Sequence, residues 1–577
     1  MAGGLYRSAN AMPDGVPPPQ DGATLISTTP HRPGTAEGAG SDSERIGGSA
    51  AGNSAIMALG SLVSRGTGFL RQLMLTAALG AFAVGDAYTT ALFIPQMVYE
   101  FLLGGILTSV LVPVLVRRRK LDGDGGQAYA QRLLTLAVLA LGAAVALAML
   151  GAPWLAGIYA SGRGEAFQQL VTALSYLLLP ILFFSGLSAL ISAVLNTRGH
   201  FAAPMWTPIL NNIVVILTCG LYIAFYGAEV IDPGDMTPGR ILLLGGGTLL
   251  GIAVQAIGLL PALRRVGFRW RPRFDFRELG LRELGRLGGW MFCYVAVNSI
   301  GLIVLINLLN QVEGRSAGPI IYNNVFLLLM MAHGIVAVSI ITALMPRMSA
   351  AAADGRFADM AADLSRSVRT VTAVLAPIAV CYAVLAEPIA VSLFDYGAAR
   401  GDADAISPVL LVAALALIPF AVSQVFTFAF WAMPDTRTPA LVNIPVVLLR
   451  ILVQVLVFAA FSTSFLASGM MIGNGLSYVA AAVISAWLLR PRIGQLGFAA
   501  MARTFGRVLV AALGAALVGL VVIALLPGEA VANRWLGFLE VAIGGAAIGG
   551  TYLGLALLLR VGEVADMVAL VRRRLGR

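Results

Sequence analysis

The chain has 577 residues, of which 58% are hydrophobic and only 12% are charged, and its formal net charge is +10. That much apolar surface cannot be hidden in the cores of ordinary soluble domains, so the composition excludes a soluble multidomain protein and indicates a polytopic membrane protein. The three cysteines, Cys219, Cys293 and Cys381, lie inside apolar stretches without metal-ligand or redox spacing. We therefore expect neither a disulfide framework nor a metal site.

The first fifty residues differ in composition from the rest of the chain. They are rich in Pro, Gly, Ser and Thr and carry almost no aromatic residues, which is typical of a segment that cannot bury enough surface to fold. They also lack the basic start and apolar core of a signal peptide. We expect residues 1–50 to be a disordered cytoplasmic tail.

Fourteen apolar segments of membrane-spanning length follow the tail. The expected fold class is therefore an all-α polytopic membrane protein with about 14 transmembrane helices. The predicted spans cover 52–79, 88–116, 133–159, 167–195, 204–227, 241–263, 287–310, 318–345, 368–386, 405–431, 438–460, 464–489, 504–526 and 535–560.

Basic residues gather in alternate loops between these spans. Eight arginines lie between Arg264 and Arg286, whereas the loops expected on the other side hold few, for example Arg163 and Arg315. By the positive-inside rule, both termini are expected in the cytoplasm of a bacterial cell membrane, and nucleic-acid binding is not needed to explain the charge. The aromatic residues among the eight arginines predict an interfacial segment that grips anionic membrane lipids.

Two proline-based patterns recur six spans apart, which predicts an internal repeat. Because six is even, the two halves should share one orientation and be related by an axis along the membrane normal. The expected organisation is an N-terminal lobe over 51–265, a C-terminal lobe over 266–490, and two further spans with a basic tail over 491–577. The recurring pairs are Pro180 with 196–198 and Pro419 with 435–437, and Pro153 with Gly162 and Pro388 with Gly397.

Charged residues inside the spans are the candidate functional residues, because a charge at mid-membrane depth should face protein or water. Arg65 and Arg71 flank two glycines in the first span, where a bend could aim both guanidinium groups at one cavity, and Arg450 lies at mid-depth in the second half. Planar guanidinium forks suit phosphate and pyrophosphate, so these three arginines predict a cationic substrate site. The alternative is that they are structural arginines paired inside the bundle.

Acidic and amide residues form a second group, expected to support binding or coupling. Glu100 lies near the depth of Arg65, so it either pairs with Arg65 or acts as a titrating carboxylate. Asp86 stands just before the second span. Asn298 and Asn307 are candidates for contact with sugar or peptide, although interhelical hydrogen bonds are the commoner role of such residues.

Several motifs resemble the MurJ (MviN) lipid II flippases of the multidrug/oligosaccharidyl-lipid/polysaccharide exporter superfamily. They are Ser64-Arg65, Gly68-Phe69 and Arg71, then Gly85-Asp86-Ala87, Leu195-Asn196-Thr197, Val391-Ser392-Leu393-Phe394 and Thr436-Arg437-Thr438-Pro439. The resemblance implies two six-helix lobes, a groove for the lipid tail beside two extra C-terminal helices, and a cationic cavity for the headgroup. It also implies export of lipid II by alternating access, with Arg65, Arg71 and Asp86 matching residues that matter in the family.

The chain departs from the family pattern in ways typical of an actinobacterial branch. Paired arginines of the second span are replaced by a stretch that ends at Glu100, and the arginine of the eighth span is missing from 321–331. Two alternatives therefore stay open: export of another polyprenyl-linked oligosaccharide or a drug, and a non-transporting scaffold for the cell-wall synthesis machinery. We expect no enzymatic chemistry and no cofactor, while a coupling ion or the membrane potential stays possible.

Overall fold

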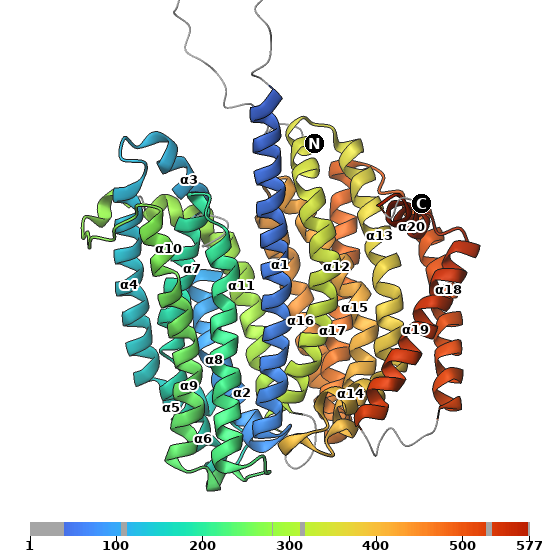
Figure 1. Ribbon diagram of the computed structural model, residues 1–577, viewed down its shortest axis with the longest axis horizontal. Coiled ribbons are helices and arrows are strands. Elements are labelled where there is room, and N and C mark those ends of the chain that lie inside the picture. Colours follow the sequence, from blue (N-terminus) through green and yellow to red (C-terminus); the bar gives the residue numbers. More distant parts are fainter. Residues whose placement is uncertain (1–39, 105–111, 280, 312–317, 527–533, 575–577) are drawn as a thin grey trace, which may run out of the picture. The chain divides into compact units, whose positions relative to one another are not determined.

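A computed structural model describes residues 40–104, 112–279, 281–311, 318–526 and 534–574 (Figure 1). Residues 56–577 form one compact unit, and the architecture below concerns that unit. The regular elements of the described ranges are all helices, which confirms the expected fold class. The first helix begins at Gly40, inside the stretch predicted as a tail, and residues 1–39 of that prediction lie outside the described residues.

In the described part of the N-terminal half there are ten α-helices, with a π-helix after the second. In chain order they are α1 (Gly40–Leu79), α2 (Ala83–Tyr99), the π-helix η1 (Glu100–Gly104), α3 (Val112–Leu121), α4 (Gln127–Leu150), α5 (Ala152–Tyr159), α6 (Glu165–Leu178), α7 (Ile181–Thr197), α8 (Ala202–Tyr226), α9 (Pro238–Gly258) and α10 (Leu260–Arg265).

The second half continues with longer helices. They are α11 (Leu281–Leu309), α12 (Pro319–Ala353), α13 (Phe357–Val384), α14 (Ala386–Phe394), α15 (Ala403–Ala432), α16 (Arg437–Ala460) and α17 (Leu466–Ile493), followed by α18 (Phe498–Leu525), α19 (Arg534–Leu558) and α20 (Gly562–Arg574). Short 3₁₀ turns over Pro233–Asp235, Phe276–Leu279, Gly397–Ala399 and Thr463–Phe465 lie between them.

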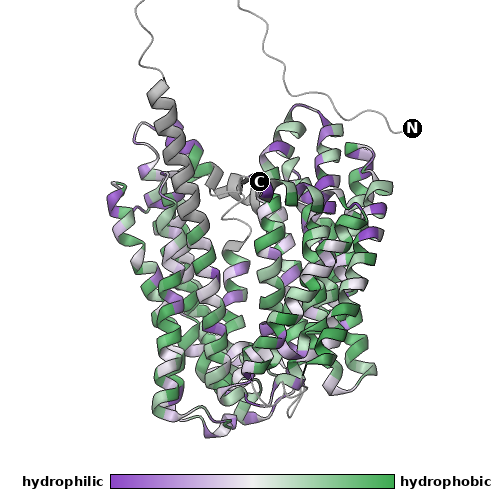
Figure 2. Ribbon diagram, turned by 45° about the vertical axis from the view of Figure 1, so that its right-hand side comes forward, coloured by the Kyte–Doolittle hydropathy of each residue, from purple (hydrophilic) through white to green (hydrophobic). Residues whose placement is uncertain are grey.

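Twelve helical spans of the described chain are long and apolar enough to cross a membrane. Hydrophobic residues dominate the long helices, and hydrophilic residues gather toward their ends (Figure 2). The first two of the fourteen predicted spans are not among the twelve. The first corresponds to α1, and the second to α2, η1 and α3, whose connection at 105–111 lies outside the described residues.

The element order repeats between the halves. In each half a long helix breaks and continues as a short one: α4 leads into α5, and α13 leads into α14. Pro153 lies in the first turn of α5, where a missing backbone N–H costs no helical hydrogen bond, and Pro388 lies in the first turn of α14. The other pair differs, because Pro180 separates α6 from α7 whereas Pro419 stays inside the continuous α15.

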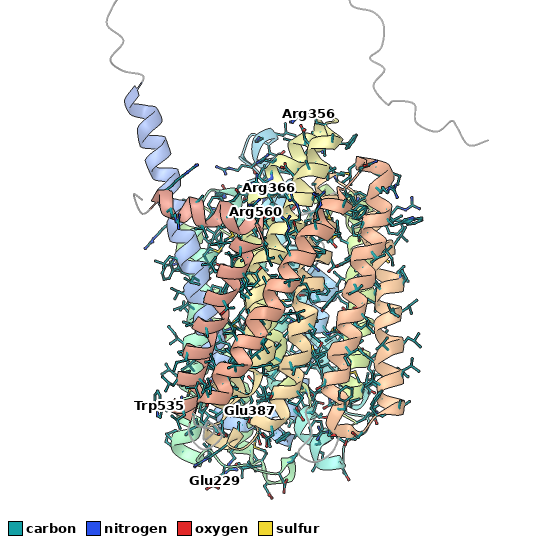
Figure 3. All side chains as sticks on the ribbon, turned by 90° about the vertical axis from the view of Figure 1, so that its right-hand side faces the viewer. Glu229, Arg356, Arg366, Glu387, Trp535 and Arg560 are labelled. Carbon is teal, nitrogen blue, oxygen red and sulfur yellow. The ribbon has the colours of Figure 1, made fainter. Side chains whose placement is uncertain are left out.

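The two ends of the bundle carry different residues. Arg356, Arg366 and Arg560 lie at one end, and Glu229, Glu387 and Trp535 lie at the other (Figure 3). The loop arginines predicted that basic residues gather on one side of the membrane, and these three arginines do lie at one end. We refer to these as the Arg356 end and the Glu387 end; α1 ends and α2 begins at the Glu387 end, beside α14 (Figure 1).

Packing within each half positions the candidate residues. In the N-terminal half α8 packs on α9, and α2 packs on α6; in the second half α15 packs on α17 and α13, and α16 packs on α17 and α11. The last two membrane helices pack on each other, and α18 also packs on α13. The segment 266–279 follows α10 and hydrogen-bonds to α4, through Gln131 to the Arg269 carbonyl and through Arg132 to Asp275.

Candidate functional site

Arg65 lies on the exposed side of α1 and reaches across to α12 of the other half. A methyl group added at Gly334 would collide with its guanidinium group, so the absence of a side chain there admits the arginine. The adjacent His333 is buried, and it interacts electrostatically with Arg65. Within the described residues Arg65 has no carboxylate partner within 4.0 Å. Its charge is therefore available at the boundary between the halves.

Arg71 points elsewhere. Its charge interacts with Tyr88 of α2 and Cys219 of α8, inside the N-terminal half, and its Nε is buried without a hydrogen-bond partner. Six residues along an α-helix turn a side chain by about 240°, so two arginines on one continuous helix face different neighbours. The expectation that a bend in α1 aims Arg65 and Arg71 at one cavity is not met in this conformation.

Arg450 lines a cavity of about 220 Å³ in the second half. The guanidinium group lies against Gly301 of α11, and its Nη2 donates a long hydrogen bond of 3.5 Å to the Asn298 carbonyl. Asn298 itself lines the cavity and donates to the Tyr294 carbonyl at 3.1 Å. The structure thus brings Arg450 and Asn298 together, while Arg65 and Arg71 do not line this cavity.

A row of rings separates Arg65 from the Arg450 cavity. The His333 ring lies 4.4 Å from Phe420, and Phe420 lies 4.8 Å from Tyr478, measured between ring centroids. Phe420 and Tyr478 both line the cavity. The three arginines therefore occupy three separate places in this conformation, and the single three-arginine site expected from the sequence is not formed.

Glu100 is the first residue of η1 and is half-buried. Among the described residues it has no cationic partner within 4.0 Å, so the predicted pair with Arg65 is absent from this conformation. The reason is geometric: Arg65 reaches α12, whereas η1 packs on α11, where the ring of Phe101 lies 6.2 Å from that of Phe292. A π-turn at this point follows Pro95 of α2, and such turns are frequent at functional sites.

Asp86 belongs to a buried network at the Glu387 end. One carboxylate oxygen accepts from Arg163 Nη2 at 2.9 Å, and the other accepts from the backbone N–H of Ile320 at 3.0 Å, in the first turn of α12. The side chains of Asp86 and Arg163 are 1% and 8% exposed. Gly318 permits this approach, because a Cβ there would overlap the carboxylate. Asp86 thus joins the two halves.

Asparagines extend this junction. Arg163 Nε donates to the Asn310 carbonyl at 3.0 Å, and Asn310 Nδ2 donates to Thr90 Oγ1 at 2.9 Å. Asn307 Nδ2 donates to the Ile158 carbonyl at 2.6 Å and to Ser161 at 2.7 Å. Asn307 was expected to support binding or coupling; its Nδ2 makes these hydrogen bonds between the halves, and its Oδ1 accepts from Gln311 Nε2 at 3.3 Å.

A further link lies along α1. Gln72 donates to Asn324 of α12 at 2.7 Å, and Asn324 donates to Thr76 at 3.0 Å. Gly397, with a φ of +63°, meets the Ala77 carbonyl so closely that any side chain would collide with it. The sequence analysis did not identify Arg163 or Gln72 as functional candidates. The one signal for Arg163 was that basic residues are rare in the predicted loops on its side of the membrane.

An apolar groove of about 580 Å³ lies among α13, α15, α17 and α18. Its lining is almost entirely aliphatic, with Phe505 of α18 and Pro419 of α15 among its walls. The part of the chain that the structure describes has no cluster of three or more His, Cys, Asp or Glu residues that could hold a metal ion.

Two repeated helical halves, an apolar groove and charged residues between the halves define the class of protein: a multi-pass membrane transporter fold. Solved structures agree on this fold. The chain aligns with the structure "Lipid II flippase MurJ, inward closed conformation" with a TM-score of 0.71 at 17% identity, covering 89% of this chain and 99% of that one. An inward-facing multidrug transporter of the MATE family and MOP superfamily aligns with a TM-score of 0.59 at 14% identity, covering 74% and 94%.

Sequence comparison identifies the family. The family model described as lipid II flippase MurJ matches residues 75–540, and the chain belongs to that family. A lipid II flippase MurJ of Burkholderia cenocepacia is 27% identical over 400 residues, which cover 67% of this chain and 74% of that protein. A probable lipid II flippase MurJ of Synechocystis is 25% identical over 464 residues, covering 78% and 84%.

Proposed function

We propose that this chain is a lipid II flippase that moves the lipid-linked peptidoglycan precursor across the cell membrane for cell-wall synthesis. The observation that carries this conclusion is the family match over residues 75–540, which includes all the described helices from α2 to α18. The transporter fold agrees with it, and the chain acts by moving its substrate, without covalent chemistry.

The geometry supplies surfaces for the two chemically different parts of such a substrate. Arg65 has no carboxylate partner within the described residues and lies at the boundary between the halves, and its planar fork of donors suits a diphosphate. The apolar groove against α18 is lined by aliphatic side chains, and a polyprenyl tail that occupies it would be shielded from water. Arg65 and the groove are the parts to which we assign headgroup and tail.

The conformation supports transport by alternating access. Hydrogen bonds from Ile320 of α12 to Asp86 and from Asn307 of α11 to α5 lie at the Glu387 end and hold the halves together there. Arg163, which pairs with Asp86 inside the N-terminal half, adds a hydrogen bond to the Asn310 carbonyl of the other half. The excess of loop arginines in the predicted cytoplasmic loops supports a cytoplasmic position for the Arg356 end and for both termini. The structure then corresponds to a state closed toward the outside, and export requires the Asp86 network to open.

Depletion of the chain from its cells tests the proposal. We expect lipid II accessible on the outer leaflet to fall while total lipid II rises, because the precursor is still made but not moved. The measurement is labelling of externally accessible lipid II in cells with no second flippase. A normal rate of appearance outside would contradict the proposal and favour a scaffold, whereas accumulation of a different lipid-linked oligosaccharide inside would indicate another substrate.

A further inference from the structure

The guanidinium group of Arg450 has unmet hydrogen-bonding capacity. It carries five N–H donors, and its one described hydrogen bond is the 3.5 Å contact with the Asn298 carbonyl. Its Nε is buried without a partner, and among the described residues it has no carboxylate within 4.0 Å. A guanidinium group at membrane depth with unmet N–H donors and no counter-charge has a high free energy. We therefore expect a group from outside the chain to accept its hydrogen bonds and balance its charge.

The cavity beside Arg450 has the size and chemistry to receive such a group. Its volume of about 220 Å³ is many times the space that a single water needs, so it has room for several waters or for a small anionic group with fewer waters. Arg450 is the one charged side chain among the described residues that line it, and neutral hydrogen-bonding groups surround it, including Asn443, Gln424 and Ser477. Tyr294 and Tyr478 also line the cavity, and both interact electrostatically with Arg450.

We propose that this cavity is a carboxylate subsite, in which Arg450 binds a carboxylate of the substrate's peptide. The inference rests on the proposed function, because lipid II carries a peptide with free carboxylates. A single fixed positive charge balances a singly charged carboxylate, whose two oxygens match the two Nη groups of a guanidinium. A diphosphate, which carries more charge, fits better at the open boundary beside Arg65, beyond the His333, Phe420 and Tyr478 rings.

The subsite would give the transporter a means to recognise the peptide as well as the lipid diphosphate. Headgroups without a peptide carboxylate would leave Arg450 uncompensated and would bind less well. The two recognition points lie on different halves, Arg65 on α1 and Arg450 on α16, so a substrate bound at both would link the halves.

Binding to the purified full-length protein in lipid nanodiscs tests the proposal. The probes are a muramyl pentapeptide with free carboxylates, the same peptide with all carboxylates amidated, and inorganic pyrophosphate, each measured by calorimetry. We expect the wild type to bind the free peptide more tightly than the amidated one. Arg450→Gln should weaken binding of the free peptide by about tenfold or more, remove its advantage over the amidated peptide, and leave pyrophosphate binding unchanged.

Two further variants keep the test decisive. Gly301→Ala retains the arginine but places a methyl group where the guanidinium now lies, so it should also weaken free-peptide binding even if Arg450→Gln folds poorly. Arg240→Gln removes an arginine in the first turn of α9 that stacks on Tyr226, and this variant should bind all three probes normally.

The outcomes separate this proposal from the proposed function. Unchanged free-peptide binding in both cavity variants would overturn the carboxylate subsite, and so would a loss confined to pyrophosphate. If binding depends on Arg450 but depleted cells still export lipid II at a normal rate, the subsite stands and the proposed function fails.

Discussion

Arg163 and Arg450 show two ways in which this fold places an arginine among packed helices. Arg163 at the Glu387 end is neutralised by Asp86 and also donates to the Asn310 carbonyl. Arg450 in the second half has one long hydrogen bond and an adjoining cavity. Breaking a buried pair leaves an uncompensated charge, whereas an arginine beside a cavity can exchange water for a ligand. The first arrangement helps to hold the two halves together, and the second leaves a guanidinium group beside a cavity, where we propose that it binds a carboxylate.

The largest effect is expected from breaking the Asp86 pair. Asp86→Asn leaves Arg163 buried without a counter-charge and should destabilise this conformation by about 3–5 kcal/mol. The measurement is thermal unfolding, together with cross-linking between α2 and α12. The double variant Asp86→Leu with Arg163→Met should recover part of the loss, because neither charge remains. Additive losses would show that the two side chains do not act as a pair.

Arg65 sharpens the comparison, because it lies between the halves but has no described carboxylate partner. Arg65→Ala should abolish lipid II export while changing the free energy of unfolding by no more than about 0.5 kcal/mol, as for exposed residues without partners. Complementation of a depleted strain and the amount of inserted protein provide the two measurements. Normal complementation at native expression would remove Arg65 from the substrate site.

Asp435, between α15 and α16, is a carboxylate outside the membrane spans that pairs with Arg492, so its contribution to stability can be compared with that of Asp86. Burial opposes its ionisation, but hydrogen bonds from Thr438 and Arg492 outweigh this and hold the pKa of Asp435 below its usual range. A lowered folded-state pKa adds stability above the unfolded value of about 3.9, and that stability is lost as the pH falls through the folded value. Asp435→Asn should therefore cost about 1 kcal/mol at pH 7 and less below pH 4. An equal cost at both pH values would contradict this role.

Glu100 should give the smallest change in stability. Because it has no described cationic partner in this conformation, Glu100→Gln should alter the free energy of unfolding by less than about 0.5 kcal/mol. It should also leave pyrophosphate affinity unchanged, since Arg65 does not depend on it here. Tighter pyrophosphate binding would instead indicate that the two residues pair in another state. Export that stops while affinity is unchanged would identify Glu100 as a titrating carboxylate.

The membrane character and the helices were predictable because they depend on local composition. An apolar run of spanning length must form a helix in lipid to satisfy its backbone, so twelve of the fourteen predicted spans reappear as membrane-length helical spans among the described residues. Pro153 and Pro388 indicated the repeat for a local reason as well, because each lies in the first turn of a short helix, where proline is tolerated, whereas Pro419 lies inside α15 without interrupting it. Arg65 and Arg450 were found because charge inside a span is rare.

The partners of these charges were not predictable, because they come from helices far apart in the sequence. Asp86 meets Arg163 and the backbone of Ile320, 77 and 234 residues away, and no local pattern encodes those contacts. Depth along a span suggested that Arg65 and Glu100 could pair, but depth says nothing about rotation around the helix axis. The sequence by itself determined which residues form the apolar spans, and the tertiary packing decided which charges are neutralised and which have no described counter-charge.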